Sequence, residues 1–330
     1  MPNVCPLCKK NEAKVLYGVS SDFAARHFAA LTNTANYVFY KENIGNLWKE
    51  NCAEVKKCRN CGLVFVEPFC AGDDRFYSLF YDNSRIYPED KWDFTVTLAE
   101  IIKQKVKAKA DLQILEIGSG NGSFIAKFVA KIGSVGKITC VENSEFCAGE
   151  LNKLPVNNVY KDLNEFFVGE NGTRYDYIFM FQVLEHLDDF QVLFGNVDKI
   201  LADDGCIFIT VPNFYQRELY DEIGIHADMP PMHVSRWSIN AFQYLAEKHD
   251  LRIAKYRIQP EKYVQKIIKL LYFIKNNIKA SAPQINQTDS IAKMHLMMRI
   301  LLKLIMHVRT FVRLKNMKFG TTFWVALMKK

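Results

Sequence analysis

Short apolar runs alternate with helix-period segments through the middle of the chain, between residues 113 and 260. The first three runs are rich in β-branched and aromatic residues and end in polar or glycine-containing turns, as strands do. The predicted strands are 113–117, 137–142, 175–181, 206–211 and 251–258. Between them, apolar residues recur at helical spacing, which predicts helices over 123–131, 144–154 and 190–201. This alternation predicts an α/β fold in which helices cover both faces of a parallel sheet.

The segments on either side of this region follow other patterns. Residues 84–110 place Leu98, Ile101 and Ile102 at helical spacing with lysines opposite, which predicts a helix. Residues 261–317 are helical by pattern, with an interruption near Pro283, whereas 318–330 favour extended backbone again. We therefore interpret 261–317 as an insertion before a closing strand. The predicted organisation is an N-terminal lobe (1–75), a linker and helix (76–112), a core (113–260), a helical insertion (261–317) and a closing strand (318–330).

Composition places the chain among globular proteins. Hydrophobic residues make up 49% and charged residues 24% of the 330 positions, which excludes wholesale disorder, collagen and a disulfide scaffold. The N-terminal residues lack the apolar core of a secretory signal, and no uncharged run of about 18 apolar residues occurs. We therefore expect a cytoplasmic protein, in which paired cysteines bind metal more often than they form disulfides.

Positive charge is concentrated near the C-terminus. Residues 261–330 carry 14 Lys and Arg against two acids, which leaves residues 1–260 with a net charge of −5. Within this segment, 294–312 is amphipathic, with Arg299, Lys303 and His307 opposite the apolar face. Three interpretations compete: packing on the core or on a dimer partner, contact with an anionic membrane surface, which would make the protein peripheral to the inner face of a membrane, and contact with RNA. Contact with nucleic acid is disfavoured, because the helix is very apolar and no aromatic stacking platform accompanies it.

Six of the nine cysteines fall in the first 75 residues, and four of them form two C-x-x-C pairs. Two such pairs can hold one Zn²⁺ tetrahedrally, and Gly62 after the second pair relieves its tight turn. The predicted ligands are Cys5, Cys8, Cys58 and Cys61. A zinc closed by four thiolates is structural, since it has no open position for a substrate. The alternative is a redox pair or unrelated thiols. We interpret Cys52 and Cys70 as small buried hydrophobic residues.

The segment 115–124 indicates a ligand site. A buried strand runs through Glu116 into a turn with glycines at 118, 120 and 122, and then into a helix. Glycine lets the backbone turn sharply and lets a ligand come close. The same architecture binds dinucleotides, but a diphosphate at a helix start disfavours a neighbouring carboxylate such as Glu116. Glu142, at the end of the next strand, can accept both hydroxyls of a ribose. A positively charged nucleoside, S-adenosylmethionine, satisfies both observations.

Residues 113–260 resemble the Rossmann-like S-adenosylmethionine-dependent methyltransferases. E-I-G-S-G-N-G at 116–122 corresponds to the first motif and V-E-N at 141–143 to the second. The resemblance implies a strand order of 3-2-1-4-5-7-6 with the seventh strand antiparallel, and it places Asp162 near the adenine and a polar turn from Gln182 after the fourth strand. The implied cofactor-binding residues are Glu116, Gly118, Gly120, Gly122, Glu142, Asp162 and Gln182. The cysteine pattern also resembles the N-terminal zinc module of a methyltransferase subgroup associated with the tailoring of sugars and small molecules.

Methyl transfer from a sulfonium is an in-line displacement that needs orientation and, in most cases, the removal of a proton. Candidate bases lie at the carboxyl ends of the strands, where open α/β sheets bind ligands. They are His186, which follows the fourth strand beside Glu185, and His233, which lies in the loop 229–237. Tyr77 is one of three tyrosines before the core that can line the cofactor mouth or simply pack.

We therefore expect a methyltransferase that acts on a small-molecule acceptor, with a sugar or nucleotide-linked sugar as the first hypothesis. The acceptor atom, whether oxygen, carbon or nitrogen, stays open. One alternative is an RNA methyltransferase that grips its substrate with the zinc lobe, which the negative charge of residues 1–260 disfavours. The other is a module that binds S-adenosylmethionine without turnover, which the intact glycine turn and both acids disfavour.

Overall fold

The computed structural model describes residues 4–82, 90–103, 111–133, 135–170, 172–222, 226, 228–262 and 320–330. The chain divides into two compact units. The first, made of residues 1–212, 228–257 and 322–330, holds both sheets and every candidate site residue; the second comprises 213–227 and 258–321. In the second unit, α10 (Phe214–Glu222) is described. The predicted insertion lies almost wholly outside the described residues, and so does its amphipathic segment 294–312.

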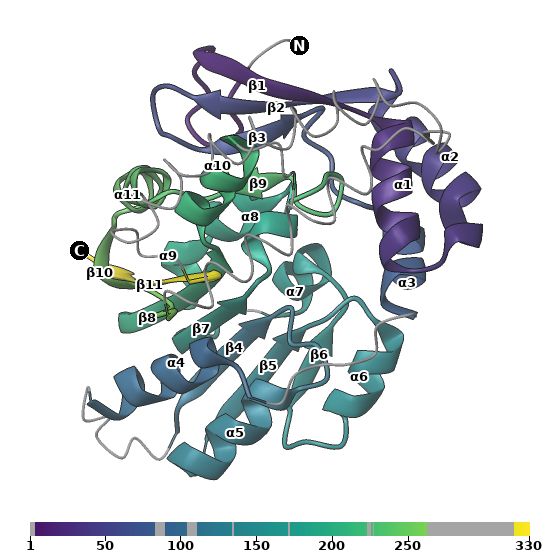
Figure 1. Cartoon of the computed structure of the whole chain (residues 1–330). Helices are drawn as coiled ribbons and strands as arrows, with labels where there is room; N and C mark the ends of the chain where they lie inside the picture. The colour runs from purple at the N-terminus through teal and green to yellow at the C-terminus, as the bar shows by residue number, and fades with distance from the viewer. Residues whose placement is uncertain are drawn as a thin grey trace, which may run out of the picture. The chain divides into compact units, whose positions relative to one another are not determined.

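A seven-stranded sheet forms the centre of the first unit, and Figure 1 shows its strands side by side. Along the sheet the order is β10-β11-β8-β7-β4-β5-β6. Strands β4 to β8 are parallel to their neighbours, and β11 pairs antiparallel with β8. This is the predicted order 3-2-1-4-5-7-6 with an antiparallel seventh strand, so that prediction is confirmed. The strands are β4 (Gln113–Ile117), β5 (Lys137–Val141), β6 (Asn158–Tyr160), β7 (Tyr175–Phe181), β8 (Leu201–Pro212), β10 (Leu251–Ile258) and β11 (Thr322–Lys329).

Helices between these strands bury aromatic side chains against the sheet. Phe124 of α5 contacts Phe94 of α4 and Phe179 of β7, with ring centroids 5.2 and 4.7 Å apart. The predicted helix 190–201 is divided in two, because Asn196 leaves helical geometry and its side chain donates to the carbonyl of Val192. The helices are α4 (Trp92–Lys103), α5 (Ser123–Ile132), α6 (Glu145–Leu151), α7 (Leu163–Gly169), α8 (Phe190–Gly195), α9 (Val197–Ile200) and α11 (Ile239–Lys248).

The N-terminal lobe contributes three strands to a smaller antiparallel sheet, in the order β1-β2-β3-β9. Its strands are β1 (Ala13–Ser20), β2 (Cys52–Cys58), β3 (Val64–Glu67) and β9 (Ser235–Arg236). The last strand comes from the core part of the sequence, about 170 residues after β3. Figure 1 shows β1, β2 and β3 together at the purple and blue end of the colour range. The lobe and the core therefore share one sheet.

Three helices accompany this sheet: α1 (Ser21–Leu31), α2 (Tyr37–Trp48) and α3 (Asp74–Asp82). The sequence pattern did not predict α1 and α2. The buried face of α1 is largely alanine, Ala24, Ala25 and Ala29, which leaves Phe28 as its one large buried side chain. Phe28 packs against Phe76 of α3 with ring centroids 4.9 Å apart. Within the described part of the chain, no helix has both the length and the apolar character needed to cross a membrane.

Candidate functional site

The turn that follows β4 is built from glycines in left-handed conformations. Gly118, Gly120 and Gly122 have φ values of 69°, 53° and 78°. A Cβ at position 118 would lie 2.3 Å from Val183 Cγ2, and one at position 122 would lie 2.4 Å from Leu154 Cδ1. Side chains at 118 and 122 are therefore disfavoured by the backbone conformation, and Val183 and Leu154 would have to move to admit them. The turn passes directly into α5, so backbone is presented where the sequence predicts a ligand.

Glu142 follows β5 and holds this turn in place. Its Oε2 accepts a hydrogen bond from the Gly120 amide at 2.7 Å, and its Oε1 accepts one from the Ser144 amide at 2.9 Å. Burial raises the pKa of Glu142, and the Ser144 and Gly120 amides oppose this rise. A carboxylate has about four acceptor positions, so two remain for a ligand after both backbone bonds are made.

Two polar atoms at the carboxyl ends of β4 and β7 are buried and have no hydrogen-bond partner among the described residues: Glu116 Oε2 and Gln182 Nε2. The strands are parallel neighbours, with Ile117 paired to Met180. Glu116 is 2% exposed, and burial raises its pKa well above the ordinary value. Gln182 has a φ of 59°, a left-handed backbone conformation that residues other than glycine rarely adopt. Buried polar groups are normally satisfied, so both atoms indicate a place for a polar ligand.

Asp162 has a clear structural role in this edge of the sheet. It caps α7, and its Oδ1 accepts from the amides of Asn164 and Glu165 at 2.8 and 2.9 Å. It follows β6, and the last residue of that strand, Tyr160, accepts from the Glu142 amide at 2.8 Å. Asp162 therefore lies at the expected edge of the sheet, while its contact with an adenine stays a prediction.

The structure brings the two predicted histidines together. His186 ends a 3₁₀ turn after β7, and its ring centroid lies 4.6 Å from that of His233. His186 Nδ1 is 2.7 Å from the Met232 carbonyl oxygen. Because a carbonyl only accepts, Nδ1 carries the proton and Nε2 carries the lone pair. Burial and the neighbouring His233 lower the pKa of His186 to about 3, which keeps the ring neutral.

Other side chains hold the two histidines in position, and most of them were not candidates from the sequence. Asp228 Oδ1 lies 3.0 Å from His233 Nδ1, and Asp228 Oδ2 lies 3.4 Å from Arg236 Nε. The Tyr77 hydroxyl donates to the Met232 carbonyl at 3.2 Å. Of these, only Tyr77 was a sequence candidate. Asp228 precedes His233 by five residues, but the loop between them has no regular period from which their contact could be predicted.

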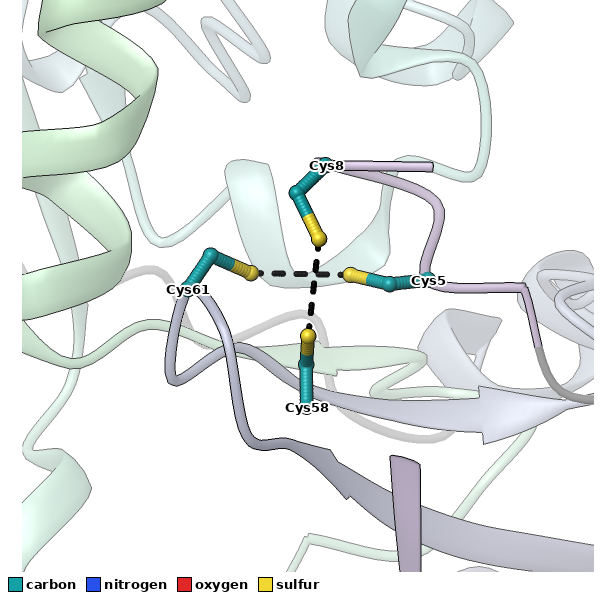
Figure 2. Close-up of side chains that lie close together, drawn as sticks. All are labelled: Cys5, Cys8, Cys58 and Cys61. Carbon is teal, nitrogen blue, oxygen red and sulfur yellow. Dashed lines mark hydrogen bonds between the residues drawn. The ribbon is translucent and has the colours of Figure 1, made fainter. Parts of the chain in front are cut away.

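Figure 2 shows the four cysteines of the two C-x-x-C pairs with their sulfurs pointing at one another. Cys5 Sγ lies 3.5 Å from Cys61 Sγ, and Cys8 Sγ lies 3.5 Å from Cys58 Sγ. All four are buried, and their sulfurs lie within 4.8 Å of one another. Thiolates about 2.3 Å from one tetrahedral zinc are about 3.8 Å apart, so the spacing fits. The hydrogen bond with Cys61 and the amides of Cys8 and Leu7 lower the pKa of Cys5 to about 5.

The loops of this cysteine cluster have the expected local geometry and are fixed to the core. Gly62 has a φ of 77°, which confirms the predicted tight turn after the second pair. The carbonyl of Pro6 accepts from Gln191 Nε2 at 2.6 Å, and that of Leu7 accepts from Lys248 Nζ at 3.0 Å. The cluster is therefore attached to the core next to α8 and α11.

The interpretation of Cys52 and Cys70 as buried hydrophobic residues was wrong. Cys52 is exposed and Cys70 is partly exposed. Cys52 begins β2, where its side chain alternates to the solvent side of the strand while that of Ala53 is buried. Neither belongs to the cluster of Cys5, Cys8, Cys58 and Cys61.

A chain of backbone bonds joins the cysteine cluster to the histidine pair. The loop of the second C-x-x-C pair leads into β3, where the Val66 amide donates to the Val234 carbonyl at 3.0 Å. The Val234 amide in turn donates to the Glu185 carbonyl at 2.9 Å. Val234 follows His233, and Glu185 precedes His186. The position of both histidines thus depends on the register between β3 and β9.

Comparisons with known proteins find similarity in the part of the chain that contains the core sheet. A family model described as "Methyltransferase domain" matches residues 90–256. (S)-coclaurine N-methyltransferase of Papaver somniferum is 25% identical over 117 residues, 34% of this chain and 33% of that protein. Pavine N-methyltransferase of Thalictrum flavum subsp. glaucum is 26% identical over 152 residues, 44% and 41% respectively. The chain thus spans about a third to two fifths of the length of these curated relatives.

Among solved structures, a SAM dependent methyltransferase from Archaeoglobus fulgidus superposes with a TM-score of 0.47 at 16% identity. The match covers 77% of this chain and 100% of that one.

Proposed function

The chain belongs to the methyltransferase-domain family, and from this premise we propose that it transfers a methyl group from S-adenosylmethionine to a small-molecule acceptor. The observation that carries the proposal is the position of Glu142, which binds the glycine turn through Gly120 and keeps acceptor positions for two ribose hydroxyls. A dinucleotide would instead place a diphosphate at this turn, beside the buried carboxylate of Glu116.

The residues at the carboxyl ends of β4, β5 and β7 fit the cofactor. Glu142 would hold the ribose, and the bare backbone at Gly118 and Gly120 would let the nucleoside come close. Glu116 Oε2 and Gln182 Nε2 are buried atoms that a polar ligand can satisfy. We assign Asp162 to the adenine of the cofactor, because the family resemblance implies this contact. When bound, S-adenosylmethionine supplies a methyl group that is already activated by its sulfonium.

The acceptor is proposed only as a small molecule. The curated relatives are named as N-methyltransferases of coclaurine and pavine, which supports a small acceptor but not a sugar. The sugar hypothesis rests on the resemblance of the cysteine pairs alone. Oxygen, carbon and nitrogen acceptors therefore all belong in the experimental panel.

We further propose that Cys5, Cys8, Cys58 and Cys61 hold one structural zinc ion. The buried cluster of four sulfurs supports this, because four thiolates close a tetrahedral site. The ion would fix the loop that leads into β3, and through β9 it would fix the loop that carries His233. Its role would be to position the site, without contact with the acceptor.

Isothermal titration calorimetry with S-adenosylmethionine and S-adenosylhomocysteine tests the cofactor assignment directly. We expect one molecule of either ligand per chain, because the described residues form one glycine turn of this kind. A panel of amine, sugar, lipid-linked and RNA acceptors, followed by S-adenosylhomocysteine release, then tests the activity. A protein that binds neither ligand would contradict the proposal.

Replacing His186 or His233 with alanine is expected to lower turnover about 100-fold, the lower range of what proton transfer contributes to catalysis. Both rings lie at the carboxyl end of β7, where they would face the acceptor and assist removal of its proton. Affinity for S-adenosylhomocysteine should stay unchanged, since the hydrogen-bond partner of His186 is the Met232 carbonyl and the glycine turn is held by Glu142. His249→Ala, after α11, is the matched control. Wild-type turnover in both variants would exclude a catalytic role for the pair.

A further inference from the structure

We propose that Glu185, His186 and His233 form a second metal site, which binds a divalent cation separate from the cysteine cluster. Among the described residues, two groups of His, Cys, Asp or Glu side chains bring at least three ligand atoms within 4.8 Å of one another. One is the cysteine cluster, and the other is this group. Its members come from the turn after β7 and from the loop before β9, so the fold assembles them from distant parts of the sequence.

The donor set and its spacing suit a transition metal ion. Two imidazoles and one carboxylate make up the 2-His-1-carboxylate arrangement, which binds divalent ions on one face and leaves other positions open. His186 Nε2 lies 4.0 Å from Glu185 Oε1. Ligand atoms about 2.1 Å from one ion are about 3 to 4 Å apart, so small side-chain rotations close the site. Glu185 is 1% exposed, so its carboxylate would bind the ion without a further loss of hydration.

Each histidine is oriented for ligation by a group behind it. A metal-bound histidine usually donates its other ring nitrogen to a carbonyl or a carboxylate. His186 Nδ1 donates to the Met232 carbonyl at 2.7 Å, and His233 Nδ1 lies 3.0 Å from Asp228 Oδ1. His186 Nε2 is thereby left as the ligating atom of that ring, while the Asp228 carboxylate lies on the Nδ1 side of the His233 ring. Arg236 Nε lies 3.4 Å from Asp228 Oδ2, so a cation already accompanies the carboxylate behind His233.

The ion would have a direct use in the reaction, and this part of the inference rests on the proposed function. A divalent cation lowers the pKa of a hydroxyl group that coordinates it. An acceptor oxygen in an open coordination position would lose its proton to solvent water near neutral pH, because both histidines would be ligands and not bases; the oxygen would then take the methyl group as S-adenosylhomocysteine leaves. The site thus favours an acceptor with a coordinating oxygen, such as a hydroxyl group, at or beside the methylated atom.

Titration of the purified, zinc-containing protein with MnCl₂, followed by electron paramagnetic resonance, tests the site without cofactor or acceptor. Mn²⁺ prefers oxygen and nitrogen ligands, so it leaves the cysteine cluster occupied by zinc. We expect one Mn²⁺ per chain. Glu185→Gln combined with His186→Ala should remove this binding, and Asp228→Asn should weaken it about 10- to 100-fold through His233. His249→Ala should bind Mn²⁺ as the native protein does.

Two results would overturn the proposal: no Mn²⁺ bound at millimolar concentration, or unchanged binding in the Glu185→Gln, His186→Ala double variant. Circular dichroism of each variant establishes that it is folded, and Glu185→Gln alone provides a nearly isosteric second variant. S-adenosylhomocysteine binding is measured in parallel. A protein that binds the nucleoside but not Mn²⁺ fails this proposal alone, whereas one that binds Mn²⁺ but not the nucleoside fails the proposed function alone.

Discussion

Replacing Cys58 with serine is expected to remove one equivalent of zinc per chain and to abolish methyl transfer. Structural zinc sites contribute about 10–16 kcal/mol of apparent binding free energy, which is comparable with the whole stability of a domain. Cys58 ends β2, and the loop that follows it enters β3. Without the ion, β3 loses its fixed register with β9, and the loop that carries His233 loses its support. S-adenosylhomocysteine binding should weaken far less than turnover, because the turn after β4 is held by Glu142 and not by the lobe.

Mass spectrometry for zinc, calorimetry with S-adenosylhomocysteine and a turnover assay on the same preparations separate these effects. Cys52→Ser is the matched control, because Cys52 lies on the same strand, is exposed and is outside the cysteine cluster. It should keep its zinc and its activity. Full zinc content in Cys58→Ser would contradict the assignment of the ligands. Normal turnover in a zinc-free variant would contradict the link from β3 through Val234 to the histidine pair.

Strands at the centre of the core sheet could be predicted from the sequence, because β4 and β7 are largely buried on both faces and appear as continuous apolar runs. The runs 113–117, 175–181 and 251–258 coincide with β4, β7 and β10. The strand order needed the family resemblance, since local patterns do not contain pairing information. The cysteine pairs were recognisable because ligand spacing within each pair is local, as is the turn at Gly62.

Features that depend on distant contacts could not be predicted. Pairing of β3 with β9 joins residues about 170 positions apart, and β9 has only two residues. The role of Asp228 depends on its contacts with His233 and Arg236, which an irregular loop brings close to it. In α1 the large apolar residues Phe23 and Leu31 are exposed while the buried face is largely alanine, so its apolar residues do not mark its buried face. These features also connect the lobe to the histidine pair. The sequence therefore indicated the four cysteines and the two histidines, but not the backbone contacts that link them.

Replacing Glu142 with alanine is expected to weaken S-adenosylmethionine binding about 1,000-fold. Hydrogen bonds to a charged group contribute about 1.5–3 kcal/mol each, and two lost ribose contacts therefore correspond to about two to four powers of ten in affinity. The substitution also removes the acceptor of the Gly120 amide, 2.7 Å away, and that of the Ser144 amide, 2.9 Å away. The glycine turn then loses one of its contacts with the end of β5, although the Gly118 amide still donates to the Val141 carbonyl at 2.8 Å, and this loss adds an ordering cost to binding.

Calorimetry on Glu142→Ala, Glu142→Gln and Glu150→Gln distinguishes the two contributions. Glutamine keeps one acceptor oxygen but presents an NH₂ group to one of the two amides, so this variant should bind more weakly than the native protein and more tightly than the alanine variant. Glu150, on the neighbouring helix α6 and paired with Lys153, is the control and should bind normally. Native affinity in Glu142→Ala would mean that the nucleoside binds elsewhere. The interpretation of the turn after β4 as its binding site would then be wrong, and so would the proposed function.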